Sequence, residues 1–341
     1  MTAQASGAKA DPRARALLES SVVWDNVWPI DLPGNESVGN TWDRFERFAR
    51  AGVSAIGLTL AGDNHNSAEA LRLVGWARKE MRARSSLLTL ARTTEDIVAA
   101  KRNGKLAVVL QFEGTRCFER DLNLIELFYD MGVRQTILAF NSANCTGGGC
   151  ADPVDGGLTP YGRRLIREAE RVGMLIDLSH VGRKTSLDAL DFAQKPMFFS
   201  HSNASPVHRC FRNLDDDQVK ACARTGGLVG VSGSSEYLGD QQCRTETLFR
   251  HLDHYVQLVG AQHVCIGFDV VFDAEPLSRW AKGRPDEWPM TKDPAWPGFN
   301  YAVPEQLVEL VGVMLSHGYP EDAVRGILGQ NYLRVCGPMW K

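Results

Sequence analysis

The amino-acid sequence predicts an α/β fold, a (β/α)8 TIM barrel, on three observations. Eight short apolar runs of strand length recur along the chain, with helical segments between them. Each run is rich in Val, Ile and Leu at consecutive positions, which is typical of a parallel sheet covered on both faces. The length of 341 residues suits one barrel of roughly 250 residues with insertions.

The predicted strands, in chain order, are residues 21–27, 53–60, 106–112, 133–140, 174–179, 196–200, 227–233 and 264–269. Residues 66–81 between them have apolar positions at helical spacing. Thr159 followed by Pro160 is typical of a helix start, because a capping hydroxyl precedes a proline in the first turn. Residues 214–227 begin with acidic side chains and end with glycine, as the helix dipole and the C-cap favour.

The predicted domain organisation is one catalytic barrel over residues 21–335, an N-terminal extension (1–20) and a C-terminal tail (336–341). Residues 270–304 break the alternation with six prolines and three tryptophans. Because this insertion follows the last strand, we expect it at the mouth of the barrel, as a lid or a partner surface. The alternative is that the insertion only covers the mouth of the barrel and has no further role. A homodimer formed through this segment is compatible with its composition.

Composition narrows the classes of partner. A net charge of −3 argues against a nucleic-acid-binding surface. Residues 1–20 lack the apolar stretch of a signal peptide, and no run reaches the ~18 apolar residues of a membrane span, so we expect a cytoplasmic protein. The eight cysteines are scattered without a CxxC pair, which favours free thiols. Cys145 and Cys150 flank a glycine-rich loop, where a metal site or disulfide is the alternative.

Polar side chains follow four of the predicted strands: Glu113, His180, His201 and Asp269. Because catalytic groups of a barrel lie where its strands end, we expect these four to converge. Two histidines with one carboxylate are a known catalytic zinc set with a position open for water. Asp269 is the candidate for proton transfer. The alternative for Glu113 and Asp269 is a buried carboxylate paired with a lysine or arginine. The remaining histidines are predicted to be structural or solvent-facing: His65, His208, His251, His254, His263 and His317.

Four sequence runs resemble the membrane (renal-type) dipeptidase family of metallopeptidases. They are LQFEGT (110–115), GLTPYGRRLIREAERVGMLIDLSHVG (157–182), FSHSNASPVHRCFRNLDDDQVKACARTGGLVGV (199–231) and HVCIGFD (263–269). The similarity extends over roughly residues 20–335. The resemblance implies an amidohydrolase-like barrel that hydrolyses dipeptides with the help of two zinc ions.

Specific roles are also implied by the resemblance. Glu113 corresponds to the carboxylate that bridges both metals, and His180 and His201 correspond to ligands of the second metal. Arg212 corresponds to the arginine that receives the substrate carboxylate, a task that suits its planar guanidinium. A surface ion pair of Arg212 with Asp215 or Asp216 is the alternative. Asp269 corresponds to the acid/base group. Phe140, Asn141 and Asn213, which lie in or beside the matching motifs, complete the predicted substrate-binding set.

The first strand departs from the family. Members usually end it with His-x-Asp, which completes the first metal site. In this chain the positions of that histidine and aspartate are occupied either by Val27 and Pro29 or by Pro29 and Asp31, depending on the register. Neither pair contains a histidine. We therefore expect one zinc ion, and a second ion is the alternative. Asp25 or Asp31 remains a candidate to reach the mouth of the barrel.

The end of the fourth predicted strand departs as well. Many members have a histidine there that contacts the substrate carbonyl, whereas this chain has Phe140. We expect Trp28 to pack beside Phe140 as an apolar wall, which would favour an apolar substrate group over a charged one.

These observations predict a zinc-dependent, dipeptidase-like hydrolase that cleaves a peptide or amide bond next to a carboxylate in a small-molecule substrate. The first alternative is a repurposed family member that acts on a non-dipeptide small molecule in a specialised catabolic or biosynthetic pathway. The second is a metal-free pseudoenzyme that binds a ligand or partner.

Overall fold

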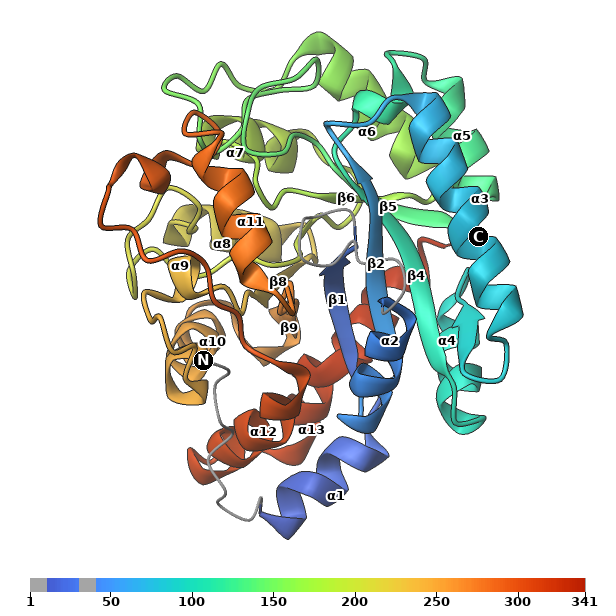
Figure 1. The fold of residues 1–341 in the computed structure, drawn as a ribbon, viewed down its shortest axis with the longest axis vertical. Coiled ribbons are helices and arrows are strands. Elements are labelled where there is room, and N and C mark those ends of the chain that lie inside the picture. Colours follow the sequence, from blue (N-terminus) through green and yellow to red (C-terminus); the bar gives the residue numbers. More distant parts are fainter. Residues whose placement is uncertain (1–10, 31–40, 341) are drawn as a thin grey trace.

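The computed structural model describes residues 11–30 and 41–340. Eight parallel strands form a closed barrel at the centre of the molecule, with helices around it (Figure 1). They are β1 (Trp24–Pro29), β2 (Ala55–Gly62), β4 (Leu106–Glu113), β5 (Val133–Ile137), β6 (Leu175–Asp177), β7 (Phe198–Phe199), β8 (Leu228–Val231) and β9 (Val264–Ile266). β1 pairs with β9, and β2 pairs with β4, so that the sheet closes. The predicted barrel and its eight strands are confirmed.

The sequence prediction missed a further strand, β3 (Leu88–Leu90), which pairs with the first residues of β4. β5 pairs farther along the same edge of β4, from Leu110 onward. Three residues are too few for a recognisable strand pattern. β3 therefore extends the sheet outside the barrel without changing the mouth.

The helices include the three predicted segments. Those that follow strands or cover the barrel are α2 (Thr41–Arg50), α3 (Ser67–Ala83), α4 (Thr94–Arg102), α5 (Asn123–Asp130), α6 (Pro160–Val172), α7 (Arg183–Phe192), α8 (Asp216–Arg224), α9 (Ser235–Leu238), α10 (Thr245–Val259) and α12 (Leu307–Ser316). The Thr159 hydroxyl accepts a hydrogen bond from the Gly162 N–H at the start of α6, as the Thr-Pro pair predicts. Asn66 and Glu69 form a capping box on α3. These starts were predictable because caps depend on residues three apart.

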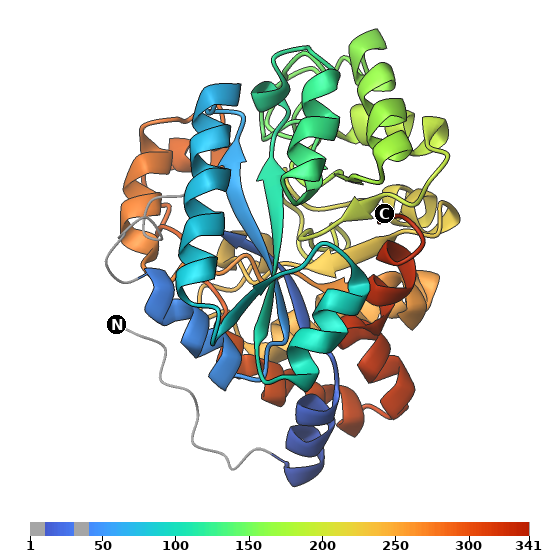
Figure 2. The same cartoon turned by 90° about the vertical axis from the view of Figure 1, so that its right-hand side faces the viewer.

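The remaining helices close the base of the barrel. α1 (Pro12–Ser20) and α13 (Glu321–Arg325) lie at the same end of the molecule as α12 (Figure 1), and the chain continues from there into α14 (Asn331–Cys336) (Figure 2). Inside this end, the ring of Trp24 lies 4.7 Å from the ring of Tyr332 and 5.7 Å from that of Trp340. The C-terminal residues thus fill the bottom of the barrel, while the top is left for the site.

The insertion after β9 folds into α11 (Ala274–Lys282) and a short 3-10 helix (Pro289–Lys292). Its apolar side chains form a cluster that Phe140 joins from the β5 loop. Trp288 and Trp296 are only 2% and 7% exposed, so they pack within the chain rather than on an outer face. The insertion is thereby attached to the mouth of the barrel.

All eight cysteines are free thiols, as predicted. Burial raises the pKa of each of them, for example that of Cys210 to about 11. In the described residues, no helix combines the length and the apolar character needed to cross a membrane.

Candidate functional site

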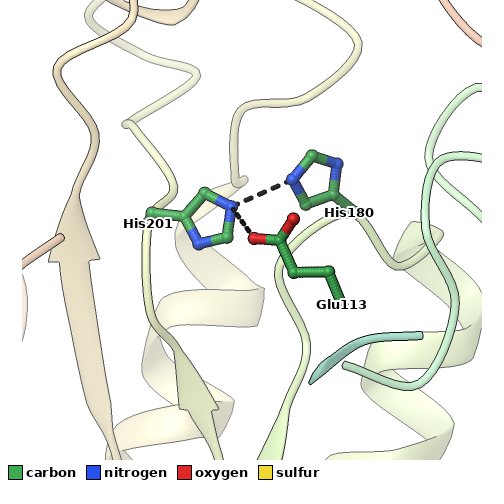
Figure 3. A group of neighbouring side chains, drawn as sticks. All are labelled: Glu113, His180 and His201. Atoms are coloured by element: carbon green, nitrogen blue, oxygen red, sulfur yellow. Dashed lines mark hydrogen bonds and ion pairs between the residues drawn. The ribbon is translucent and has the colours of Figure 1, made fainter. Parts of the chain in front are cut away.

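Glu113, His180 and His201 converge at the mouth of the barrel, from the ends of β4, β6 and β7 (Figure 3). Their nearest ligand atoms lie within 4.8 Å of one another, and all three side chains are buried. His180 Nε2 lies 2.9 Å from His201 Nε2, and His201 Nε2 lies 3.7 Å from Glu113 Oε1. Among the described residues, this is the group whose geometry suits a metal ion.

The β5 loop holds the His180 ring on two sides. Phe140 stacks on it, with ring centroids 4.1 Å apart and planes at 22°. Asn141 Oδ1 lies 2.7 Å from His180 Nδ1. The backbones of Asn141 and His180 have φ of 57° and 66°, in the left-handed region that few non-glycine residues adopt. Such strain persists where the surrounding structure holds it, as often happens at functional sites.

A buried hydrogen-bond chain holds the His201 ring. Ser200 Oγ lies 2.6 Å from His201 Nδ1 and donates a short hydrogen bond to Asp177 Oδ2. Asp177 also accepts from the N–H groups of Ser179 and Ser200 and from the side chain of Gln135. Burial raises the pKa of Asp177, while its hydrogen bonds lower it. Four donors therefore hold the Asp177 carboxyl group below the site.

These contacts fix the protons on both imidazoles. The carbonyl oxygen of Asn141 only accepts, so His180 Nδ1 carries a proton. The one proton of the Ser200 hydroxyl is given to Asp177, so His201 Nδ1 carries a proton as well. Burial and the nearby charge of Arg212 lower the pKa of both histidines well below 6.5, so the rings are neutral. Both Nε2 atoms are therefore bare acceptors that face each other.

Two unprotonated ring nitrogens 2.9 Å apart repel each other unless they share a cation with a third ligand atom. Ligand atoms on one tetrahedral zinc lie roughly 3.3 Å apart, given bonds of about 2.0–2.1 Å. The separations of 2.9 Å and 3.7 Å bracket that value. Glu113, His180 and His201 therefore fit a metal ion.

Arg212 lies beside this group and is 2% exposed. It donates to Ser202 Oγ at 2.6 Å and to the His201 carbonyl oxygen at 2.8 Å. Its guanidinium carbon lies 5.3 Å from the centre of the Tyr237 ring. The surface ion pair considered as an alternative does not form, because Asp215 and Asp216 pair with other residues, Arg183 and His254.

Asp269 follows β9, is 6% exposed and has a left-handed backbone with φ of 59°. Burial raises the pKa of Tyr237 and Tyr301, and the negative charge of Asp269 adds to both shifts. Asp269 and Arg212 thus both lie near Tyr237. Asn213 donates to the carbonyl oxygens of His208 and Tyr237, which anchors its loop.

One prediction about the first strand, the packing of Trp28, is wrong. Trp28 does not pack beside Phe140 but points outward against Phe45, Phe48 and Phe272. A register shift between Asp25 and Trp28 turns the end of β1 and explains the difference. The expected apolar wall, and the preference for apolar groups inferred from it, therefore lose their basis.

Asp25, the first-strand carboxylate that the structure describes, lies outside the metal group. It is fully buried and accepts a hydrogen bond from the Phe268 N–H at 2.8 Å. Burial raises its pKa to about 7. Asp31, the other candidate, lies outside the described residues.

Sequence reasoning missed Asp63, which joins the loops at the mouth. Its carboxylate accepts from the N–H groups of Thr115, Arg116 and Phe140 and from the Asn144 side chain. It follows β2, as the predicted site residues follow other strands, so the rule of strand ends could have found it. Asp177 and Ser200 were also missed, although they lie in the quoted runs 157–182 and 199–231.

Other histidines lie outside the metal group. Five bond to backbone or to a surface carboxylate: His65, His251, His254, His263 and His317. Cys145 and Cys150 do not form a metal group either in the described part of the chain. The Cys150 thiol instead donates to Asn141 Oδ1 at 3.3 Å.

A family model described as membrane dipeptidase (peptidase family M19) matches residues 60–278. An uncharacterized dipeptidase of Schizosaccharomyces pombe is 34% identical over 259 residues, which is 72% of this chain and 56% of that protein. Dipeptidase tcpJ of Claviceps purpurea is 28% identical over 255 residues, which is 74% of this chain and 55% of that protein. The chain thus spans about half the length of these two relatives. An uncharacterized protein of Klebsiella pneumoniae, from the pqqA 5' region, is 30% identical, over 74% of this chain and 90% of that protein.

Solved structures agree in fold. An amidohydrolase from Pseudomonas aeruginosa superposes with a TM-score of 0.83 at 26% identity, over 96% of this chain and 99% of that one. A metallopeptidase from Rhodobacter sphaeroides, bound to a phosphinate mimic of L-Ala-D-Ala, has a TM-score of 0.76 at 21% identity, over 94% and 100%. The family match and the relative from Schizosaccharomyces pombe show that the chain belongs to the membrane dipeptidase family.

Proposed function

We propose that the protein is a zinc-dependent hydrolase that cleaves a peptide or amide bond beside a carboxylate, in a dipeptide or a similar small molecule. The observation that carries this proposal is the pair of bare Nε2 atoms of His180 and His201 beside Glu113. Two imidazoles with one carboxylate are a recurrent catalytic zinc set. When bound, the ion supplies a Lewis acid that polarises a carbonyl and lowers the pKa of a water molecule.

Arg212 is proposed to bind the substrate carboxylate. Its buried guanidinium donates to neutral oxygens, and its Nε has no hydrogen-bond partner in the described part of the chain. A buried charge without a counter-ion is costly, so an anion that reaches it is bound strongly. The fork of N–H donors suits a carboxylate.

Asp269 is proposed to take and return the proton during hydrolysis. It follows β9 at the same mouth as Glu113, and its strained backbone is held among buried neighbours. A carboxylate in this position can act as a base when water attacks and as an acid when the amine leaves.

One metal ion per chain is proposed, held by Glu113, His180 and His201. Val27 and Pro29 carry no donor atom for zinc, and Asp25 is bound to the Phe268 N–H. Glu113 would then serve that one ion together with His180 and His201.

Phe140 supports a second candidate function, that of a hydrolase for a small-molecule amide other than an ordinary dipeptide. Its ring covers one face of His180, at a position where the family pattern has a histidine that contacts the substrate carbonyl. A substrate that does not need this contact is then preferred.

Two measurements on purified protein test the proposal. Elemental analysis without chelator should give one zinc per chain, and a panel of dipeptides should be hydrolysed to amino acids. A matched panel with an amidated C-terminus should be poor substrates. Stoichiometric zinc with cleavage of amides alone would favour the second candidate. Protein that lacks metal and stays inert after zinc is added would refute both.

A further inference from the structure

A pocket of about 560 Å³ opens beside the metal group. Glu113 and Phe140 form its inner part, and the insertion contributes Trp280 and Arg284 from the other side. Arg212 is not among its lining residues. The pocket is therefore built by the loops after β2, β4 and β5 and by the insertion, whereas Arg212 belongs to the loop after β7.

Three arginines line this pocket: Arg116, Arg120 and Arg284. None of them forms an ion pair with a carboxylate of the described residues. Arg116 reaches the Asp63 carbonyl oxygen at 3.5 Å, Arg120 lies over the Tyr161 ring, and Arg284 stacks on Trp280 with 4.1 Å between guanidinium carbon and ring centre. These hydrogen-bond and ring partners are neutral. Arg116 also acts on Glu119, whose pKa is lowered mainly by its hydrogen bonds from Ser67 and in part by the charge of Arg116.

Most carboxylates of the pocket are already engaged. Asp63 accepts four hydrogen bonds from backbone and amide donors. Glu119 accepts from the N–H and the hydroxyl of Ser67. Glu113 faces the metal group. Glu287 is the remaining acid of the lining. It competes with a bound anion for the arginines, as Glu119 does for Arg116.

This arrangement orients a substrate. If Arg212 holds the carboxylate of the leaving amine and the scissile bond lies at the metal group, the acyl part extends toward Glu113 and into the pocket. Phe140 and Trp280 offer apolar walls for methylene groups, and the arginines lie near the rim. We propose that this pocket binds a second anionic group, a side-chain carboxylate on the acyl residue, so that the preferred substrates are glutamyl or aspartyl amides. This inference rests on the proposed function for its orientation.

The test compares two nearly isosteric dipeptides, Glu-Gly and Gln-Gly, which differ in charge. The wild-type protein should have a kcat/KM for Glu-Gly roughly tenfold above that for Gln-Gly, since each exposed ion pair contributes modestly. The variant with Arg116→Gln, Arg120→Gln and Arg284→Gln should bring the ratio close to one and leave Gln-Gly hydrolysis unchanged. Glu287→Gln should raise the ratio, because it removes the competing charge. Arg102→Gln, at the end of α4 and outside the pocket lining, is the control for the loss of an arginine elsewhere and should leave the ratio unchanged.

Binding to the Asp269→Asn variant, measured by calorimetry with the same two peptides, separates this inference from the proposed function. Tighter binding of Glu-Gly that depends on the three arginines supports the anion-binding pocket even if neither peptide is cleaved. Cleavage of both peptides at equal rates, with equal affinities, would leave the hydrolase intact and overturn the pocket assignment. An unchanged ratio in the triple variant would overturn it as well.

Discussion

His180 Nε2 and His201 Nε2 face each other at 2.9 Å, and the partners of the two Nδ1 atoms favour the tautomers in which neither Nε2 carries a proton. Asn141 and Ser200 impose this state from the far side of each ring, because each accepts the Nδ1 proton. A metal-binding histidine usually has such a partner on its other nitrogen, which sets the tautomer and the ring orientation. The metal affinity of the proposed site is therefore expected to depend on Asn141 and Ser200, which are not among its ligands.

The first prediction concerns the ligands themselves. His180→Ala or His201→Ala should each abolish stoichiometric zinc and hydrolysis, because three protein ligands fall to two. The far-UV circular dichroism should stay unchanged, since the barrel core does not rest on residues of the mouth. His254→Ala, which removes a half-buried histidine paired with Asp216, is the control and should keep both metal and activity. Full zinc occupancy in either site variant would show that the ligand assignment is wrong.

The second prediction concerns Asn141. Asn141→Gly keeps a residue that tolerates φ of 57° but removes the acceptor for His180 Nδ1. Zinc affinity, measured by competition with a chromophoric chelator, should fall roughly 10- to 100-fold, as for other partners of metal-binding histidines. Asn141→Asp keeps an acceptor and tolerates the same backbone, so its affinity should stay within a few-fold of the wild type. Equal affinities of all three proteins would contradict a positioning role.

The third prediction concerns Arg212. Arg212→Lys keeps the charge but loses the planar fork of donors. The kcat/KM for dipeptides with a free carboxylate should fall far more than that for their amidated analogues. Equal losses on the two series would mean that Arg212 supports the loop around Ser202 and His201 rather than the substrate.

The fourth prediction concerns stability and Asp25. Burial raises its pKa to about 7, from an ordinary value of 3.8. The folded state thus prefers the protonated carboxyl, so the contribution of Asp25 to the free energy of unfolding is fully present below pH ~4 and is lost as the pH rises through ~7. The loss is about 4 kcal/mol at most, at ~1.36 kcal/mol per pH unit. Asp25→Asn does not ionise and keeps an acceptor for the Phe268 N–H.

Urea unfolding of both proteins between pH 4.5 and 8 tests this prediction. The stability of Asp25→Asn relative to the wild type should increase steadily with pH and level off above pH 7. Parallel stability curves would mean that Asp25 has an ordinary pKa in the folded protein.

The strands and the convergence of Glu113, His180 and His201 were predictable because their signals are local. An apolar run marks a buried strand, and the residue after it, such as His180 or His201, lies at the mouth by the geometry of the barrel. Helix starts at Thr159 and Asn66 were equally visible, since a cap and its partner are three residues apart. The sequence therefore located the side chains that meet at the mouth.

The supporting contacts were not predictable, because they join distant parts of the chain. Asp63 binds the Phe140 N–H from another loop, and Ser200 links His201 to Asp177 on the neighbouring strand. The orientation of Trp28 depends on a register shift within β1, and alternation of apolar residues does not report such a shift. A one-residue change of register moves a side chain from the mouth to the outer core.

The raised pKa values of the eight thiols have a practical consequence for spectroscopy. Maleimides react with thiolates, and raised pKa values keep the native cysteines in the slow-reacting thiol form at neutral pH. Val154, which is 82% exposed on the loop after Cys150, offers a place for an introduced cysteine. Val154→Cys should take up one dye or spin label per chain without removal of any native cysteine, and its signal would report how this loop moves when substrate arrives.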